Sequence, residues 1–387
     1  MRVGHFMQGI WDPGGVASYI RRISQALLEM GHEVFYFDSE ERTGDAWRNV
    51  IRVQDATGLY RSASEKGIDL LHLHLLPSNF TSPELPSLAT IHGHYPYCSS
   101  GTEFLQALRR PCPHIHQPAR CLAYRMLYKC GSRKPDRILH EFAAQQPARS
   151  ALKQMPINTV SQFMKARMIR AGISEQQIRV IYLPAPAVKE VVPPSNSTPP
   201  RFLFLGRLTP QKGVQWLLDA MAKTSQPMLL DIGGEGEEEK ALKHQAVRLG
   251  LQQQVTFHGW LMPDQTAVLL KQARALVFPS LYHEPGGTVA FEAMANQKAV
   301  VMSRVGGMPE IVQHEQNGLL VPPGDTNALA AALDRLAADY TLACVLGERG
   351  RKDILEKYTL EHHMDHLMES YKGCLQQYTR TEALSGA

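Results

Sequence analysis

Short apolar runs alternate with amphipathic segments along most of the chain. The runs at residues 1–8, 33–37, 68–76 and 88–92 have the length and composition of buried strands. Between the first two, the apolar residues of 16–30 recur every three or four positions, which predicts an amphipathic helix. A strand, a helix and a strand in this order predict parallel pairing in an α/β sheet.

The same alternation continues to the C-terminus, with one interruption. Residues 191–200 contain four prolines and four small polar residues, and they predict a linker. Around it, strands are predicted at 157–161, 179–183, 201–205, 228–233, 255–258, 275–278 and 299–303, and helices at 162–171, 214–223, 237–249, 264–272, 328–340 and 358–378.

A chain of 387 residues is longer than a single hydrophobic core commonly supports. The linker therefore predicts two domains, one at residues 1–190 and one at 201–357, each with a doubly wound parallel sheet. Two such domains would face each other across a cleft lined by the carboxyl ends of their strands.

Residues 98–135 show no regular pattern and are expected to be irregular. They hold four of the six cysteines, with histidines between them. Free buried thiols are the preferred interpretation, because the spacing is not that of a zinc knuckle; a structural metal or a redox-linked pair is the alternative. No catalytic metal is predicted. The four are Cys98, Cys112, Cys121 and Cys130.

Composition narrows the class of protein. Hydrophobic residues make up 44% of the chain and charged residues 20%, as in globular proteins. There is no run of 18 apolar residues and no apolar leader, so a cytoplasmic protein is expected. Residues 101–153 hold 10 basic residues against 3 acidic ones. This stretch suits either a solvated surface or an anionic partner such as a membrane; no nucleic-acid motif accompanies it.

Residues 284–292 carry the clearest chemical signal. They follow a predicted strand, contain Gly286 and Gly287 in a turn, and lead into a helix that holds Glu292. Free N–H groups at a helix N-terminus suit a phosphate, and the Glu284 and Glu292 carboxylates can accept hydrogen bonds from hydroxyl groups. A plain strand-to-helix turn with two surface glutamates is the alternative.

Other polar groups follow other strands. Arg207 and Lys212 lie in the loop after strand 201–205, and two cations opposite a helix N-terminus suit a diphosphate. The first strand ends in a loop at 9–15 with Gly14 and Gly15, which lacks the dinucleotide fingerprint. His92 also follows a strand, as a ligand-binding or a structural loop histidine. Walker and kinase motifs are absent from the sequence.

Three stretches in order give the chain a family resemblance. They are GRLTPQKG at 206–213, the two glutamates Glu284 and Glu292, and VGGMPEIV at 305–312 followed by NGLLVPPGD at 317–325. Together they resemble the retaining glycosyltransferases of family 4, which have the GT-B fold. The resemblance covers nearly the whole chain. It implies that residues 1–190 face the acceptor, that 201–357 bind the donor, and that helix 358–378 packs back on the first domain.

The resemblance also implies residue roles. Arg207 and Lys212 would bind the donor diphosphate, Glu284 the sugar hydroxyls and Glu292 the ribose. His92 would face the donor sugar, and the chain departs from the family at Gly286, where an aromatic residue is usual. Backbone and loop positions complete the expected donor site: Gly14, Gly15, Gly206, Gly259, Trp260, Leu261, Gly286, Gly287, Thr288 and Val289. In helix 358–378, His362, His363 and His366 are expected at the surface.

The implied activity is hexosyl transfer with retention and without a metal or other cofactor. The leaving phosphate would accept the acceptor's proton, and the cleft would close on the donor. UDP-glucose or a related UDP-sugar is the favoured donor, with GDP-mannose second. The expected acceptor is a saccharide or lipid-linked hydroxyl in polysaccharide or exopolysaccharide synthesis, at the inner face of the cytoplasmic membrane. A nucleotide-sugar epimerase, a phosphorylase and a catalytically silent binding protein are the alternatives.

Overall fold

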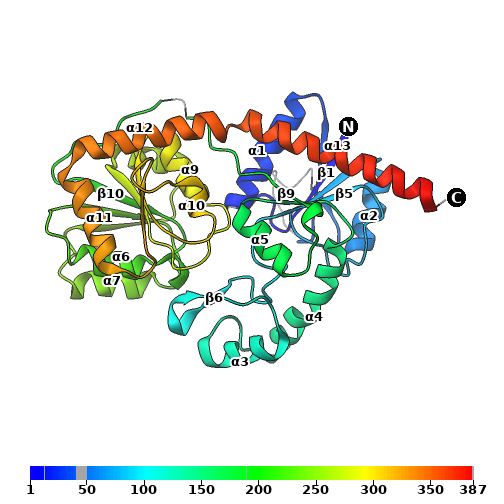
Figure 1. Cartoon of the computed structure of the whole chain (residues 1–387), viewed down its shortest axis with the longest axis horizontal. Helices are drawn as coiled ribbons and strands as arrows, with labels where there is room; N and C mark the ends of the chain where they lie inside the picture. The colour runs from blue at the N-terminus through cyan, green and yellow to red at the C-terminus, as the bar shows by residue number, and fades with distance from the viewer. Residues whose placement is uncertain (13, 41–49, 189, 386–387) are drawn as a thin grey trace.

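The computed structural model describes residues 1–12, 14–40, 50–188 and 190–385, so Pro13 of the first glycine loop lies outside the described residues. Two parallel sheets lie side by side, each with helices packed around it (Figure 1). Residues 191–200 separate the last strand of the first sheet from the first strand of the second. The exact domain limits stay a prediction.

The first sheet has seven strands in the order β3-β2-β1-β4-β5-β8-β9, and each neighbouring pair is parallel. The strands are β1 (Arg2–Phe6), β2 (Glu33–Asp38), β3 (Val50–Arg52), β4 (Leu70–Leu73), β5 (Ser87–Ile91), β8 (Ile157–Thr159) and β9 (Ile178–Val180). Its helices are α1 (Gly15–Glu29), α2 (Ala56–Glu65), α3 (Pro118–Tyr128), α4 (Pro135–Leu152) and α5 (Gln162–Arg170), with a short hairpin of β6 (Phe104–Leu105) and β7 (Arg110–Pro111).

The second sheet has six parallel strands in the order β12-β11-β10-β13-β14-β15. The strands are β10 (Arg201–Leu205), β11 (Leu229–Gly233), β12 (Val255–Gly259), β13 (Ala275–Phe278), β14 (Ala299–Ser303) and β15 (Leu319–Val321). Its helices are α6 (Val214–Met221), α7 (Glu239–Arg248), α8 (Pro263–Gln272), α9 (Thr288–Ala295), α10 (Met308–Ile311), α11 (Thr326–Ala338) and α12 (Tyr340–Lys357), with a short 3₁₀ turn η4 (Pro210–Lys212). The last helix is α13 (Leu360–Ser385), and two further 3₁₀ turns, η2 (Gln106–Leu108) and η3 (Glu175–Gln177), belong to the first domain.

Both sheets are doubly wound, and the point at which the strand order reverses determines where a ligand can bind. Every residue of β13 and β14 is buried, as expected for apolar strands covered by helices on both faces. The strand order reverses between β1 and β4 in one sheet, and between β10 and β13 in the other. Ligands of such sheets bind outside the carboxyl ends of the strands at this reversal.

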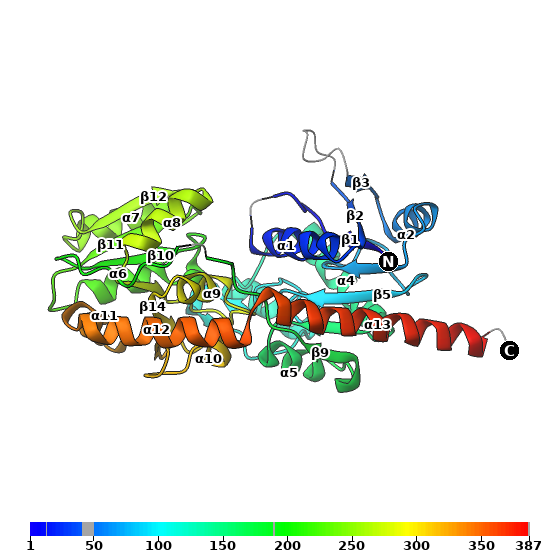
Figure 2. The ribbon, with the colours of Figure 1, turned by 90° about the horizontal axis from the view of Figure 1, so that it is seen from above.

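Helices α12 and α13 run along one side of the molecule from the second sheet to the first (Figures 1 and 2). α13 docks on the first sheet: Tyr371 is fully buried and its hydroxyl lies 2.8 Å from His72 Nδ1. The prediction that His363 lies at the surface is wrong. It is 4% exposed because α13 presses it against α1, where its Nε2 lies 3.1 Å from the Tyr19 hydroxyl. His362 and His366 are exposed, as predicted.

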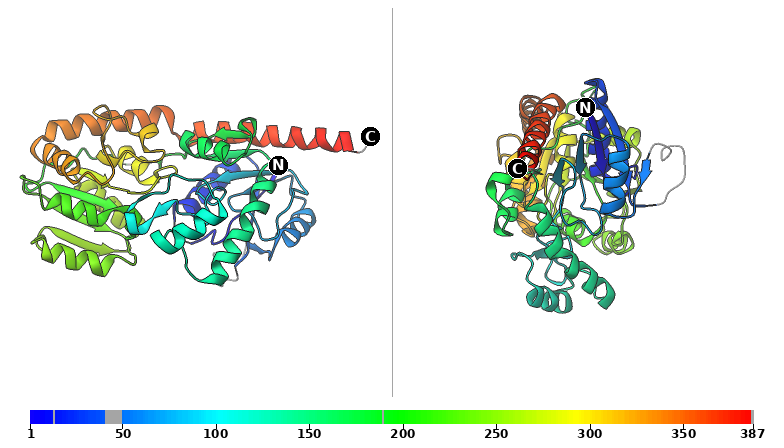
Figure 3. Two further views of the ribbon diagram at one scale, coloured as in Figure 1. Left: turned by 60° about the horizontal axis from the view of Figure 1, so that its bottom comes forward. Right: turned by 90° about the vertical axis from the view of Figure 1, so that its right-hand side faces the viewer.

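Helices α3 and α4 project from the first sheet, most clearly in the right-hand view of Figure 3. The prediction that residues 98–135 are irregular is therefore wrong in part, since α3 forms within them. The hydrophobic pattern gave no signal because the only buried side chain described on α3 is a charged one, Arg125, which pairs with Glu141. In the described parts of the chain, no helix is long and apolar enough to cross a membrane.

Candidate functional site

The two functional residues predicted from separate motifs lie against each other. Lys212, at the end of η4, donates from Nζ to Glu284 Oε1 at 2.7 Å. The Ser280 hydroxyl donates to the same oxygen at 2.6 Å. Glu284 is 5% exposed, and both donors use Oε1. Its side chain is thereby held in one orientation, with Oε2 left available to accept a hydrogen bond from a ligand hydroxyl.

The glycine turn after Glu284 fits tightly against both domains. A side chain at Gly286 would begin 3.0 Å from Val160 Cγ2 and 3.2 Å from Leu183 Cδ1, both in the first domain. Gly287 has a φ of 52°, and a Cβ there would lie 2.1 Å from the Met308 methyl carbon. The backbone conformation thus favours glycine at 287, and glycine at 286 lets the first domain approach.

Two helix N-termini from different domains meet beside this turn. α9 begins at Thr288, followed by the buried Val289, and α1 begins at Gly15 after the N-cap residue Gly14. A Cβ at Gly15 would lie 3.6 Å from the Thr288 hydroxyl oxygen. Because the first N–H groups of a helix lack partners within it, two such ends together form a ready site for an anion.

Glu292 on α9 and Arg22 on α1 carry opposite charges on the two helices that meet here. Burial raises the pKa of the Glu292 carboxyl, and the nearby Arg22 guanidinium opposes this rise. Burial also lowers the pKa of Arg22, which donates to the Pro184 carbonyl at 2.8 Å. Glu292 therefore lies on α9 within the electrostatic reach of the first domain.

Arg207 is exposed in the loop that follows β10 and Gly206. Its charge acts on the half-buried Tyr282. Burial and Glu284 raise the pKa of Tyr282 well above its usual value, and Arg207 opposes this rise. Lys212 Nζ lies 5.3 Å from the centre of the same ring. Tyr282 thus lies beside the Lys212–Glu284 pair and within the electrostatic reach of Arg207, a position that the sequence analysis did not assign.

The loop expected to contribute Gly259, Trp260 and Leu261 to the donor site follows β12. The Trp260 N–H donates to Glu235 Oε1 at 3.2 Å, and the Trp260 side chain is 50% exposed. Leu261 packs towards Gly233, where a Cβ would lie 2.3 Å from Leu261 Cδ1. Gly259 has a φ of 68°, a conformation that favours glycine. An exposed ring beside a glycine turn is suited to stacking with a planar ligand.

His92 lies just after β5, half-buried, with its Nε2 3.1 Å from His74 Nδ1. Burial lowers the pKa of His92 to about 3, so the ring is neutral at physiological pH. Its edge-on contact with Tyr19, with ring centres 5.1 Å apart, places it under α1. His92 is therefore adjacent to the helix whose N-terminus meets α9.

The sequence analysis missed His94, which bridges the domains. Its Nε2 lies 2.7 Å from the His283 carbonyl oxygen, beside Glu284. A carbonyl only accepts, so Nε2 carries the proton and Nδ1 accepts from the Tyr97 hydroxyl at 2.6 Å. The sequence shows that a second histidine follows β5, but it gives no sign of the contact, because the partner residue lies 189 residues further along the chain.

Glu310 was also missed, although it lies in a quoted motif. Both carboxylate oxygens accept backbone N–H groups of Gln162 and Phe163 at 2.7 Å, at the N-terminus of α5 in the first domain. The Tyr182 hydroxyl donates to Glu310 Oε2 at 2.9 Å. Glu310 therefore caps a helix of the other domain, because its carboxylate accepts hydrogen bonds from N–H groups that have no partner within that helix.

The cysteines of residues 98–135 are free and half-buried rather than buried. Among the described residues, no three of their sulfur atoms lie within 4.8 Å of one another. Burial raises the pKa of Cys130 to about 12, and the pKa values of Cys112 and Cys121 are also raised by burial. These thiols are protonated and weakly nucleophilic in this state.

Comparisons with known proteins match both halves of the chain. Residues 188–353 match the model for glycosyl transferases group 1, and residues 13–140 match the model for glycosyltransferase family 4. An uncharacterized glycosyltransferase of Methanocaldococcus jannaschii is 37% identical over 180 residues. That match covers 46% of each protein, so the chain spans about half the length of this curated relative.

Two solved structures match over nearly the full length. Sucrose-phosphate synthase from Thermosynechococcus elongatus has a TM-score of 0.73 and 21% identity, covering 97% of this chain and 99% of that one. Anabaena HepE in complex with UDP-glucose has a TM-score of 0.67 and 18% identity, covering both chains fully (100%). The predicted GT-B fold is confirmed, and with the two domain matches it supports a GT-B glycosyltransferase.

Proposed function

We propose that this chain is a retaining glycosyltransferase. It would move a hexose from a nucleotide diphosphate sugar to a hydroxyl of a saccharide or lipid-linked acceptor in polysaccharide synthesis. One observation carries the proposal: the Glu284 carboxylate is fixed through Oε1 by Lys212 and Ser280, beside a junction of two helix N-termini. A fixed acceptor for sugar hydroxyls next to an anion site matches the two parts of such a donor.

The diphosphate would lie between the N-termini of α1 and α9. Gly15 and Thr288 mark these ends, and Arg207 adds a positive charge from the loop after β10. Partial positive charges aimed at a leaving phosphate stabilise the negative charge that develops as the glycosidic bond breaks. Lys212 would add a second positive charge while it holds Glu284 Oε1, so that Glu284 presents its free Oε2 to the sugar.

Transfer would take place on the face from which the diphosphate leaves, with retention at the anomeric carbon. The leaving phosphate oxygen would take the acceptor's proton, so no side chain and no metal or other cofactor is required as a base. Both carboxylates, Glu284 and Glu292, lie in the second domain, which does not favour the flanking acid pair of a glycosidase.

UDP-glucose or a related UDP-sugar is the proposed donor, ahead of GDP-mannose. HepE, which shares the fold, binds UDP-glucose in its solved complex. The exposed ring of Trp260 at the end of β12 would stack on the base, and Glu292 on α9 would accept a ribose hydroxyl. Neither contact distinguishes the two bases strongly, so the donor is decided by assay.

Replacing the fixed carboxylate tests the proposal. Glu284→Gln keeps the shape but loses the charge that pairs with Lys212, and Lys212→Ala removes the cation. We expect each change to lower transfer from the preferred nucleotide sugar by roughly a hundredfold or more. The measurement is sugar transfer from a panel of labelled UDP- and GDP-sugars, after thermal-shift screening of the same panel.

Glu315→Gln is the matched control, because this exposed carboxylate pairs only with groups on the surface such as Arg335. It should leave transfer unchanged. Full turnover by Glu284→Gln would rule out the assigned site. Epimerisation of the donor without an acceptor, release of the sugar by inorganic phosphate, or binding without any turnover would each replace transfer with one of the alternative functions.

The proposed acceptor reaches the enzyme at an anionic membrane. Leu127 and Leu139, on α3 and α4, are 66% and 72% exposed. Met126 and Leu122 are also exposed on α3, and α3, α4 and the loop between them carry exposed basic residues: Arg120, Lys129, Arg133, Lys134 and Arg137. Exposed apolar side chains among cations favour the surface of a bilayer with anionic lipids, and α3 and α4 project away from both sheets (Figure 3).

Replacing two leucines tests this contact. Leu127→Ser with Leu139→Ser should reduce flotation with vesicles of anionic phospholipid, because less apolar area can enter the interface. Leu355→Ser is the control, since Leu355 is 53% exposed on α12, far along the chain from this surface. Equal flotation of all three proteins, or equal binding to zwitterionic vesicles, would contradict the proposal.

A further inference from the structure

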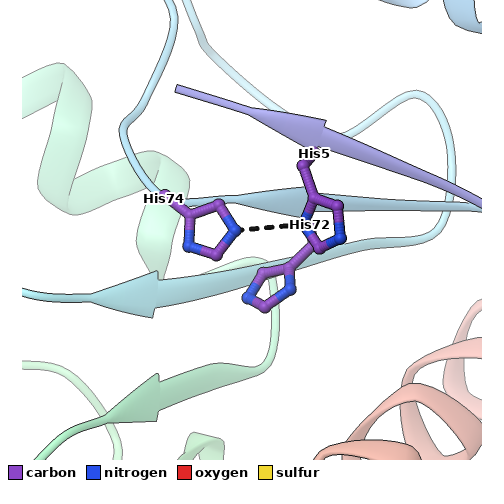
Figure 4. A group of neighbouring side chains, drawn as sticks. All are labelled: His5, His72 and His74. Carbon is purple, nitrogen blue, oxygen red and sulfur yellow. Dashed lines mark hydrogen bonds between the residues drawn. The ribbon is translucent and has the colours of Figure 1, made fainter. Parts of the chain in front are cut away.

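Three histidines form a continuous hydrogen-bonded chain at the winding reversal of the first sheet. His5 on β1 is the register partner of His72 on β4, so their side chains share a face of the sheet. His5 Nδ1 lies 3.1 Å from His74 Nε2, the dashed contact in Figure 4. His74 Nδ1 lies 3.1 Å from His92 Nε2. The chain therefore runs from the core to the residue proposed to face the donor sugar.

All three rings are neutral. Burial lowers the pKa of His5 and of His92 to about 3, and burial with neighbouring histidines lowers the pKa of His74 well below its usual value. A neutral ring carries one N–H and one bare nitrogen. His74 makes both contacts, so it must donate one and accept the other, and both bonds must therefore point the same way along the chain.

The His5 end of the chain decides in which direction the hydrogen bonds point. His5 Nε2 is buried and has no partner among the described residues. The two possible directions leave a bare nitrogen there or an unpaired N–H. A buried N–H without an acceptor is the rarer and costlier state. The proton of His5 thus lies on Nδ1 and is donated to His74, which in turn donates from its own Nδ1 to His92.

We propose that His5 and His74 are positioning residues that fix the tautomer of His92. With Nε2 accepting from His74, His92 carries its proton on Nδ1 and presents an N–H to the ligand. This inference rests on the proposed function and on the expectation, from the family resemblance, that His92 faces the donor sugar. The group it recognises is then an oxygen that accepts a hydrogen bond, such as a hydroxyl or ring oxygen of the sugar.

A second group that overlaps this chain, made of His5, His72 and His74, has the composition of a metal site, but its contacts argue against one. The ligand atoms of His5, His72 and His74 lie within 4.8 Å of one another. However, His72 Nδ1 lies 2.8 Å from the Tyr371 hydroxyl and its Nε2 lies 2.7 Å from Thr90 Oγ1. Both nitrogens of His72 are in use, and His74 uses both of its nitrogens in the chain, so His5 Nε2 is the one nitrogen of these three rings without a partner among the described residues.

The direct test is the tautomer of His92 in the ligand-free protein. Protein labelled with ¹⁵N-histidine gives long-range ¹H–¹⁵N correlations that separate an Nδ1–H from an Nε2–H ring, and His92→Gln identifies the signals of His92. We expect the Nδ1–H form alone in the native protein and a mixture of forms in His5→Phe. His72→Phe is the matched control, equally buried but outside the chain, and should leave His92 unchanged.

Kinetics give the second readout. His5→Phe should raise the KM for the nucleotide sugar about fivefold to tenfold, the value of one hydrogen bond between neutral groups. The Kd of the free nucleoside diphosphate should not change, because its binding does not involve His92; general damage to the fold would weaken both. His5→Asn should restore the native KM, because its amide nitrogen can donate from the position of Nδ1.

Three results would overturn the inference. They are an Nε2–H tautomer of His92 in the native protein, an unchanged tautomer in His5→Phe, and one equivalent of metal that copurifies and is lost in His5→Phe. The NMR measurement needs no substrate, so it decides the inference even if sugar transfer fails. Absence of transfer with an Nδ1–H His92 would contradict the proposed function alone.

Discussion

At the scale of single residues, Gly286 changes from a departure into an explained feature. The family resemblance places an aromatic residue here, whereas this chain has none. In the structure the space for a side chain is filled by Val160 and Leu183 of the first domain. The missing ring is replaced by an interdomain contact, which the sequence could not show because the contacting residues lie in the other domain.

A large side chain at this position should hold the domains apart. Gly286→Phe would overpack the contact at a cost of about 1–3 kcal/mol, which corresponds to a rise of roughly fivefold to a hundredfold in the KM for the donor. Small-angle X-ray scattering should show a larger radius of gyration. Gly373→Phe is the control, since Gly373 on α13 has open space around it. An unchanged radius and KM would contradict the prediction.

At the scale of elements, the strands that are covered by helices on both faces were predicted correctly, whereas a helix that docks through polar contacts was missed. Strands β10, β13 and β14 were predicted because continuous apolar runs are needed between two helical layers. Helix α4 was not predicted: it contains Pro147, and its docked face includes Gln145 and Arg149, which donate to the carbonyls of Tyr95 and Pro96. Polar docking of this kind leaves no apolar periodicity.

The docking of α13 should contribute strongly to stability. Tyr371→Ala would leave a cavity among fully buried residues and cost about 3–5 kcal/mol of the free energy of unfolding. Tyr371→Phe would remove only the hydrogen bond to His72, at about 1 kcal/mol. Denaturant unfolding followed by circular dichroism measures both. Equal stability of the two variants would show that α13 does not pack on the first sheet in solution.

At the scale of the whole molecule, the grouping of candidate site residues in the second domain was predictable and the contacts between domains were not. Glycine turns and charged residues after strands mark this group within the second domain alone. Glu310 and His94, by contrast, act on partners 148 and 189 residues away. Their residue types carry no sign of a partner, because capping and bridging depend on how the two sheets are placed.

Glu310 should set the balance between open and closed forms. Glu310→Gln removes the negative charge at the N-terminus of α5 and leaves one oxygen to accept two N–H groups. We expect a larger radius of gyration in the absence of donor and a several-fold higher donor KM, because binding must then also supply closure. An equally compact variant with native KM would show that Glu310 has no part in closure.

The polypeptide passes between the two domains twice, and the two passages are joined to each other. The Ala185 N–H, just before the first passage, donates to the Tyr358 carbonyl, in the second, at 2.8 Å. This bond ties the two connections between the domains together near one point. Opening would therefore be a hinge motion with its pivot at this bond, and stiffening these few residues would slow product release without touching the chemistry.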